Sequence, residues 1–200
     1  MSEQQLDPSK RTWLIASTCA GVVGGAAVAV PFVSTFAPSE RARAAGAAVE
    51  ADISGLKPGE MMTVEWRGKP VWIVRRTPEQ LASLKATEDL LADPRSERKP
   101  AETTPMADTR NQWRSLRPEI LVVVGICSHL GCSPSEKFTP GPQPSLPADW
   151  QGGFLCPCHG STFDMAGRVF KNKPAPDNLE VPPHTFLSDS RLLIGEAKTA

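Results

Sequence analysis

Four of the five cysteines and two of the three histidines of this 200-residue chain lie in two short segments. The first reads CSHLGC, residues 127–132, and the second reads CPCHGS, residues 156–161. Each segment has one cysteine followed two or three residues later by a histidine, and each also holds a second cysteine. Thiolates and imidazoles are ligands that bind zinc and iron in proteins. The two segments therefore predict a metal centre built from two loops, with two further cysteines to be explained.

Two kinds of metal centre use these residue types. A structural zinc site takes four Cys or His ligands, usually as two tight pairs on short knuckles. Here the pairs are CxH and CxxH with two extra cysteines interleaved. An iron-sulfur cluster with two Cys on one iron and two His on the other uses the residues more completely. It assigns Cys127 and Cys156 to one iron, and His129 and His159 to the other.

With these motifs the sequence resembles the Rieske iron-sulfur subunits of cytochrome bc complexes, and closely those of proteobacterial ubiquinol-cytochrome c reductases. The resemblance covers most of the chain. It implies a mainly β fold in which antiparallel sheets carry an inserted cluster-binding subdomain, at about residues 127–177, together with one helix. It also implies one [2Fe-2S] cluster per subunit, with Cys127, His129, Cys156 and His159 as its ligands.

The resemblance gives roles to residues around these ligands. In the family the remaining cysteines, here Cys132 and Cys158, form a disulfide that holds the two loops together. A disulfide needs an oxidising compartment, so we expect the cluster outside the cytoplasm. The motif KPAP, residues 173–176, matches the family's proline loop, which covers the cluster, although the family commonly has Gly where Lys173 stands. The residues expected around the cluster are Leu130, Gly131, Ser161, Phe163, Pro174 and Pro176.

Phe163 departs from the family pattern. Many relatives have a tyrosine two residues after HGS, and its hydroxyl donates a hydrogen bond to a cluster cysteine. This chain reads HGSTFD and contains no tyrosine. Hydrogen bonds to the sulfurs tune the potential of such clusters. We therefore expect a lower reduction potential of the cluster than in relatives with tyrosine. Ser161 matches the family's other hydroxyl donor.

The composition predicts a loop-rich, mainly β head. The chain has 20 Pro and 15 Gly against seven Phe and five Trp. Its formal net charge of zero gives no reason to expect nucleic-acid binding. The Pro- and Ser-rich segment between His129 and Cys156 is longer than the commonest family spacing, and we predict a surface insertion there. Strands are expected at residues 50–53, 61–66, 71–75, 119–126, 153–155, 162–163, 168–170, 185–187 and 191–194.

One helix is predicted after residue 77. Thr77 can cap it, Pro78 suits the first helical position, and Gln80 completes a capping box. Its apolar face ends before Pro94. Residues 93–115 are polar and are predicted to form a long surface loop, and His184 is expected to be a surface residue.

Residues 13–33 predict a membrane anchor. They carry no charge and would form a helix about 31 Å long, which matches the hydrocarbon core of a bilayer. The flanking SKRTWL, residues 9–14, resembles a twin-arginine export signal with Lys10 in place of the first arginine. We predict a cytoplasmic N-terminus at 1–12, an anchor at 13–36, a flexible tether at 37–49 and the head at 50–200. A cleaved signal peptide remains the alternative.

The resemblance implies an electron-transfer subunit of a ubiquinol-cytochrome c reductase in the bacterial inner membrane, with its head on the periplasmic side. The expected partners are ubiquinol, cytochrome b and a membrane-anchored c-type cytochrome in a dimeric complex. His159 is expected to hydrogen-bond the quinol and to accept its proton. The alternatives are the small Rieske subunit of a periplasmic oxidase such as arsenite oxidase and, from a different class, a zinc-stabilised interaction module.

Overall fold

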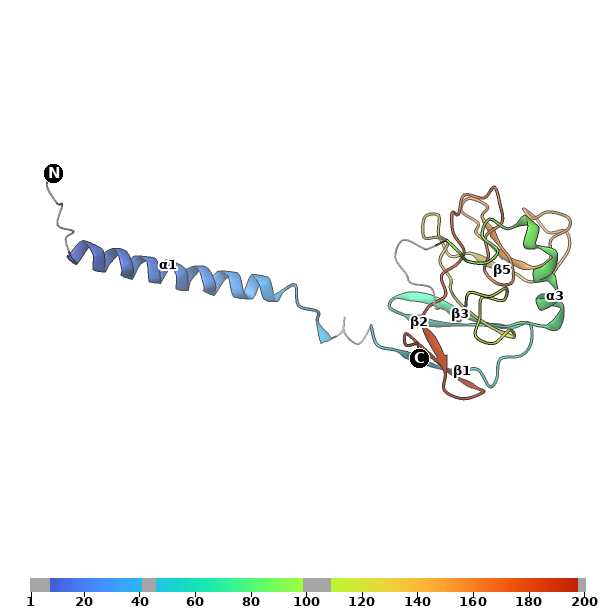
Figure 1. Ribbon diagram of the computed structural model, residues 1–200, viewed down its shortest axis with the longest axis horizontal. Helices are drawn as coiled ribbons and strands as arrows, with labels where there is room; N and C mark the ends of the chain where they lie inside the picture. The colour runs from blue at the N-terminus through green and yellow to red at the C-terminus, as the bar shows by residue number, and fades with distance from the viewer. Residues whose placement is uncertain (1–7, 41–45, 99–108, 198–200) are drawn as a thin grey trace. The chain divides into compact units, whose positions relative to one another are not determined.

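The computed structural model describes residues 8–40, 46–98 and 109–197. The chain divides into two compact units, Met1–Ala44 and Ala45–Ala200. The first contains helix α1, Pro8–Ser34 (Figure 1). Its segment Ser9–Ser34 is, by length and composition, able to cross a membrane. Part of the predicted tether, residues 41–45, lies outside the described residues, so the tether stays a prediction.

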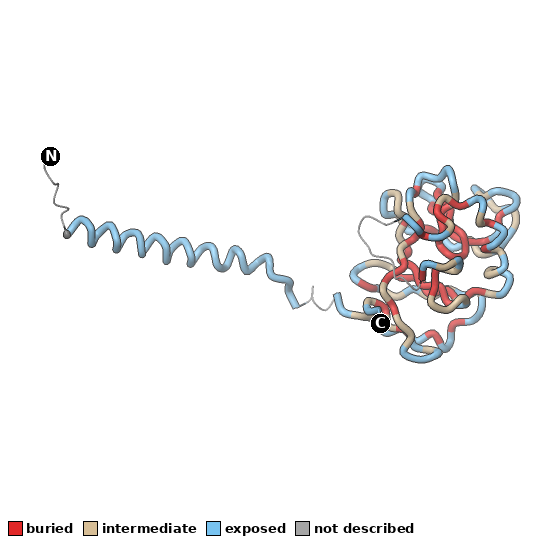
Figure 2. The backbone as a smooth tube through the Cα atoms, in the orientation of Figure 1, coloured by how far each residue is buried: buried red, intermediate tan, exposed pale blue. Residues whose placement is uncertain are grey.

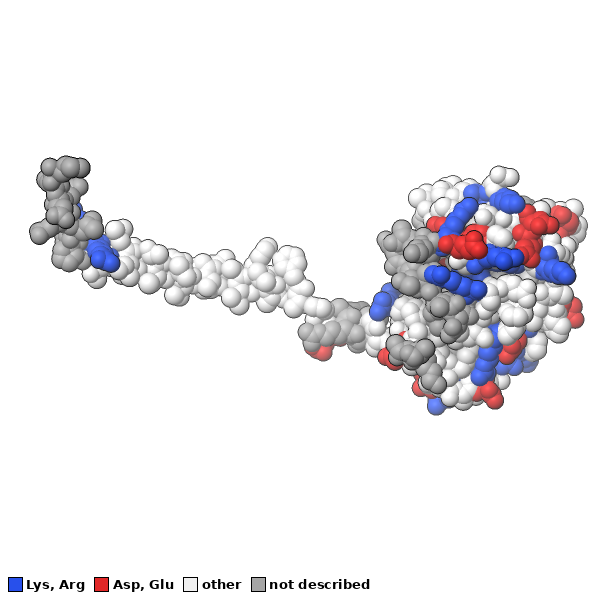
Figure 3. All heavy atoms as spheres, in the orientation of Figure 1, with Lys and Arg blue, Asp and Glu red and all other residues white. Residues whose placement is uncertain are grey.

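Helix α1 has the surface expected of a segment that lies in lipid. Its residues from Ser9 onward are exposed, as the colour of the backbone shows (Figure 2). Beyond Lys10 and Arg11 it carries no charge along its length (Figure 3). An apolar helix with no buried face does not match a soluble amphipathic helix, which has one polar and one apolar side. The 26-residue apolar segment is about 39 Å long, which is enough to span a bilayer with some tilt.

Two three-stranded antiparallel sheets form the base of the second unit (Figure 1). One has the order β1-β9-β8, where β1 is Val49–Asp52, β8 is His184–Phe186 and β9 is Arg191–Ile194. The other has the order β2-β3-β4, where β2 is Met61–Trp66, β3 is Lys69–Arg75 and β4 is Ile120–Val124. These strands confirm the mainly β prediction, and their bounds lie within two residues of those expected.

The β2-β3-β4 sheet is buried on both faces, which explains the uninterrupted apolar sequence of β4. Since side chains alternate along a strand, Leu121 and Val123 belong to one hydrophobic cluster. Ile120, Val122 and Val124 belong to a second cluster, which is shared with β1 and β9. On the first face Trp72 stacks on Phe154, with 5.1 Å between ring centroids. The sheet therefore separates the base core from a second core that contains the two loop cysteines Cys127 and Cys156.

The third sheet carries the predicted cluster-binding segment. It has the order β5-β6-β7, with β5 at Ser135–Lys137, β6 at Gly153–Leu155 and β7 at Thr162–Phe163. The predicted strand at residues 168–170 is wrong: this segment makes only isolated bridges, Phe163 with Val169 and Leu91 with Phe170. A strand of two or three residues is too short for the alternation of apolar and polar residues to be visible in the sequence.

The prediction of a surface insertion between His129 and Cys156 is wrong in part. Strand β5 lies within this segment and pairs with β6. Phe138 packs edge-on against Phe154, at 5.4 Å between centroids. Trp150 is 2% exposed and donates its indole N–H to the carbonyl of Lys137 at 2.8 Å. Two aromatic residues thus anchor a Pro-rich segment whose composition alone predicts a surface loop.

Helix α3, Pro78–Ala86, begins as predicted. Thr77 Oγ1 accepts the N–H of Gln80, and Gln80 Oε1 accepts the N–H of Thr77, which completes the capping box. The helix ends at Thr87 and is followed by the short 3-10 helix η1, Glu88–Leu90. The local capping signal therefore predicts the start of the helix better than its end.

Two predictions of surface position are wrong. Within the predicted surface loop at residues 93–115, the side chains of Asp93, Thr109 and Arg114 are buried. Residues 99–108 of this loop lie outside the described residues. His184 is 0% exposed, its Nδ1 lies 2.8 Å from the carbonyl oxygen of Pro182, and burial lowers its pKa. A polar side chain is expected at the surface only when the protein interior offers it no hydrogen-bond partner. Here backbone carbonyls from distant segments accept hydrogen bonds from the buried donors.

A buried ion-pair network joins the third sheet to the rest of the head. Arg168 and Asp164 are each 1% exposed, with 2.7 Å between Nη2 and Oδ2. Two more arginines are buried beside them and donate to backbone carbonyls, Arg76 to Met165 at 3.1 Å among others. Burial lowers the pKa of Arg76 to about 9 and that of Arg114 to about 10, while Asp164 opposes both changes. Asp164 is therefore the central carboxylate of this network.

Replacing Gly153 by alanine is expected to destabilise the head by more than about 2 kcal/mol. Gly153 opens β6 with a φ of 148°, and a Cβ there would overlap the backbone carbonyl of Phe163 on the paired strand. Thermal unfolding of the full chain measures the effect. Gly55→Ala, where a Cβ meets nothing within 4 Å, is the control and is expected to change stability by less than about 0.5 kcal/mol. Equal effects of the two variants would contradict the steric argument.

Candidate metal centre

Two similar loops present the cysteines and histidines of the motifs. The first follows β4 and the second follows β6. In the first, the N–H of Cys127 donates to the carbonyl of Cys132 at 2.8 Å, and the N–H of Gly131 donates back to Cys127 at 3.1 Å. In the second, the N–H of Cys156 donates to Ser161 at 2.7 Å, and the N–H of Gly160 donates to Cys156 at 3.0 Å. Both loops close with the same hydrogen bonds.

A glycine makes each closure possible. Gly131 has a φ of 80° and Gly160 a φ of 73°, the left-handed region that glycine adopts most readily. Each glycine is the fifth residue of its loop, in CSHLG and in CPCHG. This shared spacing of cysteine and glycine is the sequence signal for the paired loops.

The loops separate their thiols from their imidazoles. Cys127 and Cys156 are each 2% exposed, whereas His129 is half-buried and His159 is exposed. The two imidazole rings lie edge to face with 4.7 Å between their centroids. The structure thus brings together the four residues predicted as ligands, with thiols in the core and imidazoles at the surface.

The thiol of Cys127 lies in an environment with opposing effects on its pKa. Burial raises this pKa most strongly, and the neighbouring thiol of Cys156 raises it further. The N–H of His129 and the hydroxyl of Ser161 act in the opposite direction, because both favour the thiolate form. A buried sulfur that already has two donors beside it is suited to carry negative charge as a metal ligand.

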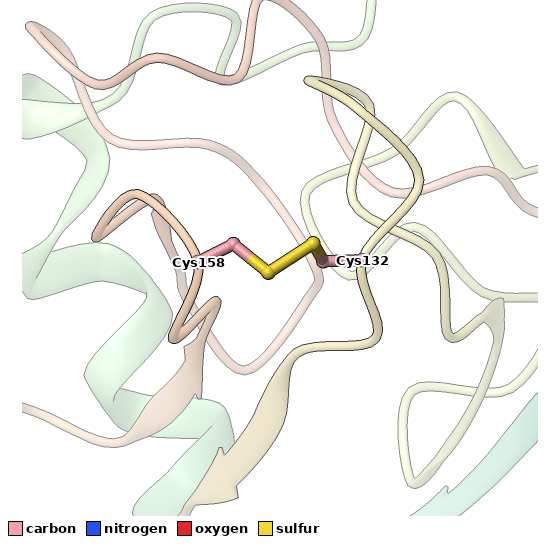
Figure 4. Close-up of a disulfide and its surroundings, with 2 residues drawn as sticks. All are labelled: Cys132 and Cys158. Carbon is pink, nitrogen blue, oxygen red and sulfur yellow. A yellow bond between two sulfur atoms is a disulfide. The ribbon is translucent and has the colours of Figure 1, made fainter.

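The remaining two cysteines form a disulfide between the loops. Cys132 and Cys158 are bonded to each other across 26 residues of sequence (Figure 4). The sulfur of Cys156 lies within 4.8 Å of both sulfurs of this bond. Because Cys132 and Cys158 are already bonded to each other, these three residues do not make a metal site by themselves. The disulfide predicted from the family resemblance is present.

The donor set fits the predicted cluster. Cys127 and Cys156 are free thiols, and the disulfide leaves no other thiol on the two loops. Two cysteines and two histidines, each pair supplied by both loops, match the ligands of a [2Fe-2S] centre with histidines on one iron. The same four residues also suit zinc, so the donor set by itself fits both metals.

The other predicted site residues lie around these loops. Phe163 is 0% exposed and shares a hydrophobic cluster with Cys127 and Cys156. Leu130 is 71% exposed at the tip of the first loop, next to the exposed Gly131. In the proline loop, Pro174 and Pro176 are exposed. The loop also contains Ala175, which is 4% exposed and donates its N–H to Ser161 Oγ at 3.0 Å.

Ser128 contributes to this region and was absent from the sequence-based prediction. Its hydroxyl donates to the carbonyl of Asp177 at 2.7 Å and accepts the N–H of the same residue at 3.2 Å. These bonds join the first loop to the end of the proline loop across 49 residues. No local pattern in the sequence points to a partner at that separation.

The comparisons with known proteins agree on one family. Residues 47–183 match the Rieske [2Fe-2S] domain. The ubiquinol-cytochrome c reductase iron-sulfur subunit of Allochromatium vinosum is 53% identical over 98% of this chain and 93% of its own length. The subunit of the same name from Bradyrhizobium diazoefficiens is 39% identical over 94% of this chain and 95% of its own. A chain in a solved structure of a hyperthermophilic respiratory complex III matches with a TM-score of 0.44 and 26% identity, over 89% of this chain and 97% of that one.

Proposed function

Because this chain belongs to the Rieske [2Fe-2S] domain family, we propose that it is the electron-transfer subunit of a ubiquinol-cytochrome c reductase. The observation that carries this function is the pairing of two buried thiols with two adjacent imidazoles on loops joined by a disulfide. The 53% identity over nearly the whole chain supports this subunit type.

Cys127 and Cys156 would hold one iron of the cluster, and His129 and His159 the other. When bound, a cluster of this kind accepts and donates one electron. The cysteines suit their role because they are buried and because the N–H of His129 and the hydroxyl of Ser161 favour a charged sulfur at Cys127. The disulfide keeps the two loops at a fixed separation.

His159 would receive the quinol at the surface of the head. It is exposed, and an imidazole that binds iron through one ring nitrogen keeps the other for a hydrogen bond and a proton. The exposed Leu130 lies at the tip of the opposite loop. We infer that these two residues form part of the face that contacts ubiquinol and the partner subunits. Homology to complex III subunits implies cytochrome b and a c-type cytochrome as those partners.

Helix α1 is long and apolar enough to cross a membrane, and we propose that it anchors the chain there. We propose a single-pass protein of the bacterial inner membrane with its head in the periplasm, where the oxidising environment maintains the Cys132–Cys158 disulfide. The Lys10-Arg11 pair before the apolar segment supports export through the twin-arginine route. The tether at 37–49 would let the head move between the quinol site and the cytochrome, and its last residue, Val49, begins β1.

The optical and low-temperature EPR spectra of the purified full chain test the proposed function. A [2Fe-2S] centre with histidine ligands is expected to give a coloured protein that becomes paramagnetic on reduction. A colourless, zinc-containing protein would overturn the proposal. Purification from the membrane with b-type and c-type haem is the second measurement, and co-purification with a different redox enzyme would favour the oxidase alternative instead.

Replacing Phe163 by tyrosine is expected to raise the midpoint potential by roughly 40 mV. This value converts about 1 kcal/mol for a new hydrogen bond to a cluster sulfur by 59 mV per tenfold change. Phe163 is 0% exposed and lies in the same hydrophobic core as both thiols, and the expected gain is that of a tyrosine hydroxyl that donates to a cluster sulfur. Phe170→Tyr, at a half-buried phenylalanine near the third sheet, is the control. An unchanged or lower potential in Phe163→Tyr would count against the hydrogen bond.

A further inference from the structure

The proline loop has few hydrogen-bond donors of its own. Between residues 173 and 177 only Lys173, Ala175 and Asp177 have a backbone N–H, because proline lacks one. Pro174 and Pro176 are exposed, so burial of their rings does not hold the loop in place. Its position therefore depends on hydrogen-bonding groups that other segments supply.

Three side chains from other segments bind this part of the chain. The two cysteine-bearing loops each supply one serine hydroxyl, which binds the N–H of Ala175 in one case and both backbone groups of Asp177 in the other. The third side chain is that of Arg98, which lies 78 residues before the loop and donates from Nη1 to the carbonyl of Pro176 at 2.9 Å. Arg98 thus binds the loop from outside the two cysteine-bearing loops.

Arg98 binds a peptide group that is also bound from its other side. The peptide group between Pro176 and Asp177 is trans, so its C=O and N–H point in opposite directions. Arg98 donates to the C=O, and the Oγ of Ser128 accepts the N–H at 3.2 Å. A peptide group bound at both ends cannot rotate without breaking one of the two hydrogen bonds. Arg98 and the first cysteine-bearing loop therefore hold the proline loop between them.

The backbone of Arg98 is itself held by a buried carboxylate. Asp93 is 7% exposed. Its Oδ1 accepts the N–H of Glu97 at 2.9 Å, and its Oδ2 accepts the N–H of Arg98 at 3.1 Å. The backbone carbonyl of Asp93 accepts a hydrogen bond from the side chain of Asn178 at 2.9 Å. The turn at 93–98 is thus bonded to the segment that follows the proline loop, and Arg98 reaches the loop from a fixed backbone position.

We propose that Arg98 is a positioning residue that holds the proline loop against the first cysteine-bearing loop. This inference rests on the proposed function, because the proline loop is the segment expected to cover a bound cluster. Without Arg98, the peptide group between Pro176 and Asp177 keeps only its hydrogen bond to Ser128. The loop then opens more often, since local opening is governed by the few bonds that must break.

Amide hydrogen exchange of the full chain measures this hold directly. Arg98→Ala is expected to speed exchange at Asp177 and Ala175 about fivefold, the factor that corresponds to one ordinary hydrogen bond. Exchange at Val169, whose N–H is bound by the side chain of Asn178 at 2.8 Å, is expected to stay unchanged. Because Arg98 is exposed, the variant is expected to fold. Unchanged exchange at Asp177 would overturn the proposal, and so would an equal acceleration at Val169.

Two further variants of Arg98 separate its donor groups from its aliphatic stem. Arg98→Lys keeps the positive charge and a donor, and it is expected to restore slow exchange at Asp177. Arg98→Met keeps an apolar stem without a donor, and it is expected to exchange as fast as Arg98→Ala. Slow exchange in Arg98→Met would mean that packing of the stem holds the loop and would overturn the proposal. Equally fast exchange in the Lys and Ala variants would overturn it as well.

Arg95→Ala is the matched control, because Arg95 is an exposed arginine of the same segment. This variant removes the same charge and is expected to leave exchange at Asp177 at the rate of the unaltered chain. Acceleration as large as in Arg98→Ala would show that any loss of positive charge in the segment has this effect. That result would overturn the role of the bond to Pro176.

Loss of the visible absorption of the cluster in the presence of an iron chelator gives a second readout. It is expected to be about fivefold faster in Arg98→Ala than in the unaltered chain, by the same factor for one hydrogen bond, and unchanged in Arg95→Ala. An unchanged rate in Arg98→Ala would overturn the positioning role. If the purified chain lacks the iron-sulfur spectrum, the proposed function fails, and exchange at Asp177 still tests whether Arg98 holds the loop. If the spectrum is present and both rates are unchanged, only this inference fails.

Discussion

Replacing Cys158 by serine is expected to lower the thermal unfolding midpoint of the full chain by roughly 10 °C and to leave most of the purified protein without its cluster. The disulfide spans 26 residues, and closing a loop of that length stabilises the folded state by about 3.5 kcal/mol in the loop-entropy model. For a chain of this size each kcal/mol corresponds to about 2–4 °C. Without the bond, Cys156 and His159 on the second loop are no longer held opposite the first.

Iron content and thermal unfolding measured on the same samples separate the two effects. Cys19→Ser removes the exposed cysteine of α1 and serves as the matched control, with no expected change in either measurement. A mild reductant should lower the unfolding midpoint of the unaltered chain toward that of Cys158→Ser and should not lower the variant further. Full iron content and an unchanged midpoint in Cys158→Ser would show that the loops do not need the disulfide.

Replacing Asp164 by asparagine is expected to cost about 3–5 kcal/mol, the usual penalty for removing one partner of a buried ion pair. Asp164 Oδ1 accepts the N–H groups of Ala166 and Arg168, and its Oδ2 accepts from the Arg168 side chain at 2.8 Å. The variant would leave the positive charges of three buried arginines without their central carboxylate. Chemical denaturation of the full chain measures the loss in free energy of unfolding.

The exposed ion pair of Arg191 with Glu50, 2.9 Å apart and 60% and 42% exposed, supplies the comparison. Glu50→Gln is expected to change stability by less than about 1 kcal/mol because water and salt screen exposed charges. In the double variant Asp164→Asn with Arg168→Met, part of the lost stability is expected to return, since the uncompensated charge is removed as well. If Asp164→Asn cost no more than Glu50→Gln, the buried network would not contribute to stability.

Several elements could be predicted because their signals are local. The apolar run of β4 predicts a buried strand, and Thr77 with Gln80 predicts a helix start that the structure confirms. The spacing of Cys and His predicts a metal centre, since ligands on a short loop are necessarily close to one another. The apolar run after residue 12 likewise predicts helix α1.

Contacts between distant segments could not be predicted in this way. Trp150 and Phe138 turn a Pro-rich segment into part of the core, and Arg114 is buried although its surroundings in the sequence are polar. In both cases the partner is supplied by another segment of the fold. Polarity alone predicts exposure, and it fails wherever the fold supplies hydrogen-bond acceptors inside.

The sequence by itself determined the chemistry of this protein: which side chains can bind metal, which pair of cysteines is left over, and which segment can cross a membrane. Only the tertiary structure decided that the two loops close alike, that the thiols are buried while His159 is exposed, and that Ser128 binds Asp177. Ligand type is a property of each residue, so it can be read from the chain. Burial and long-range hydrogen bonds depend on how segments far apart in the chain pack together, and a local pattern does not contain that information.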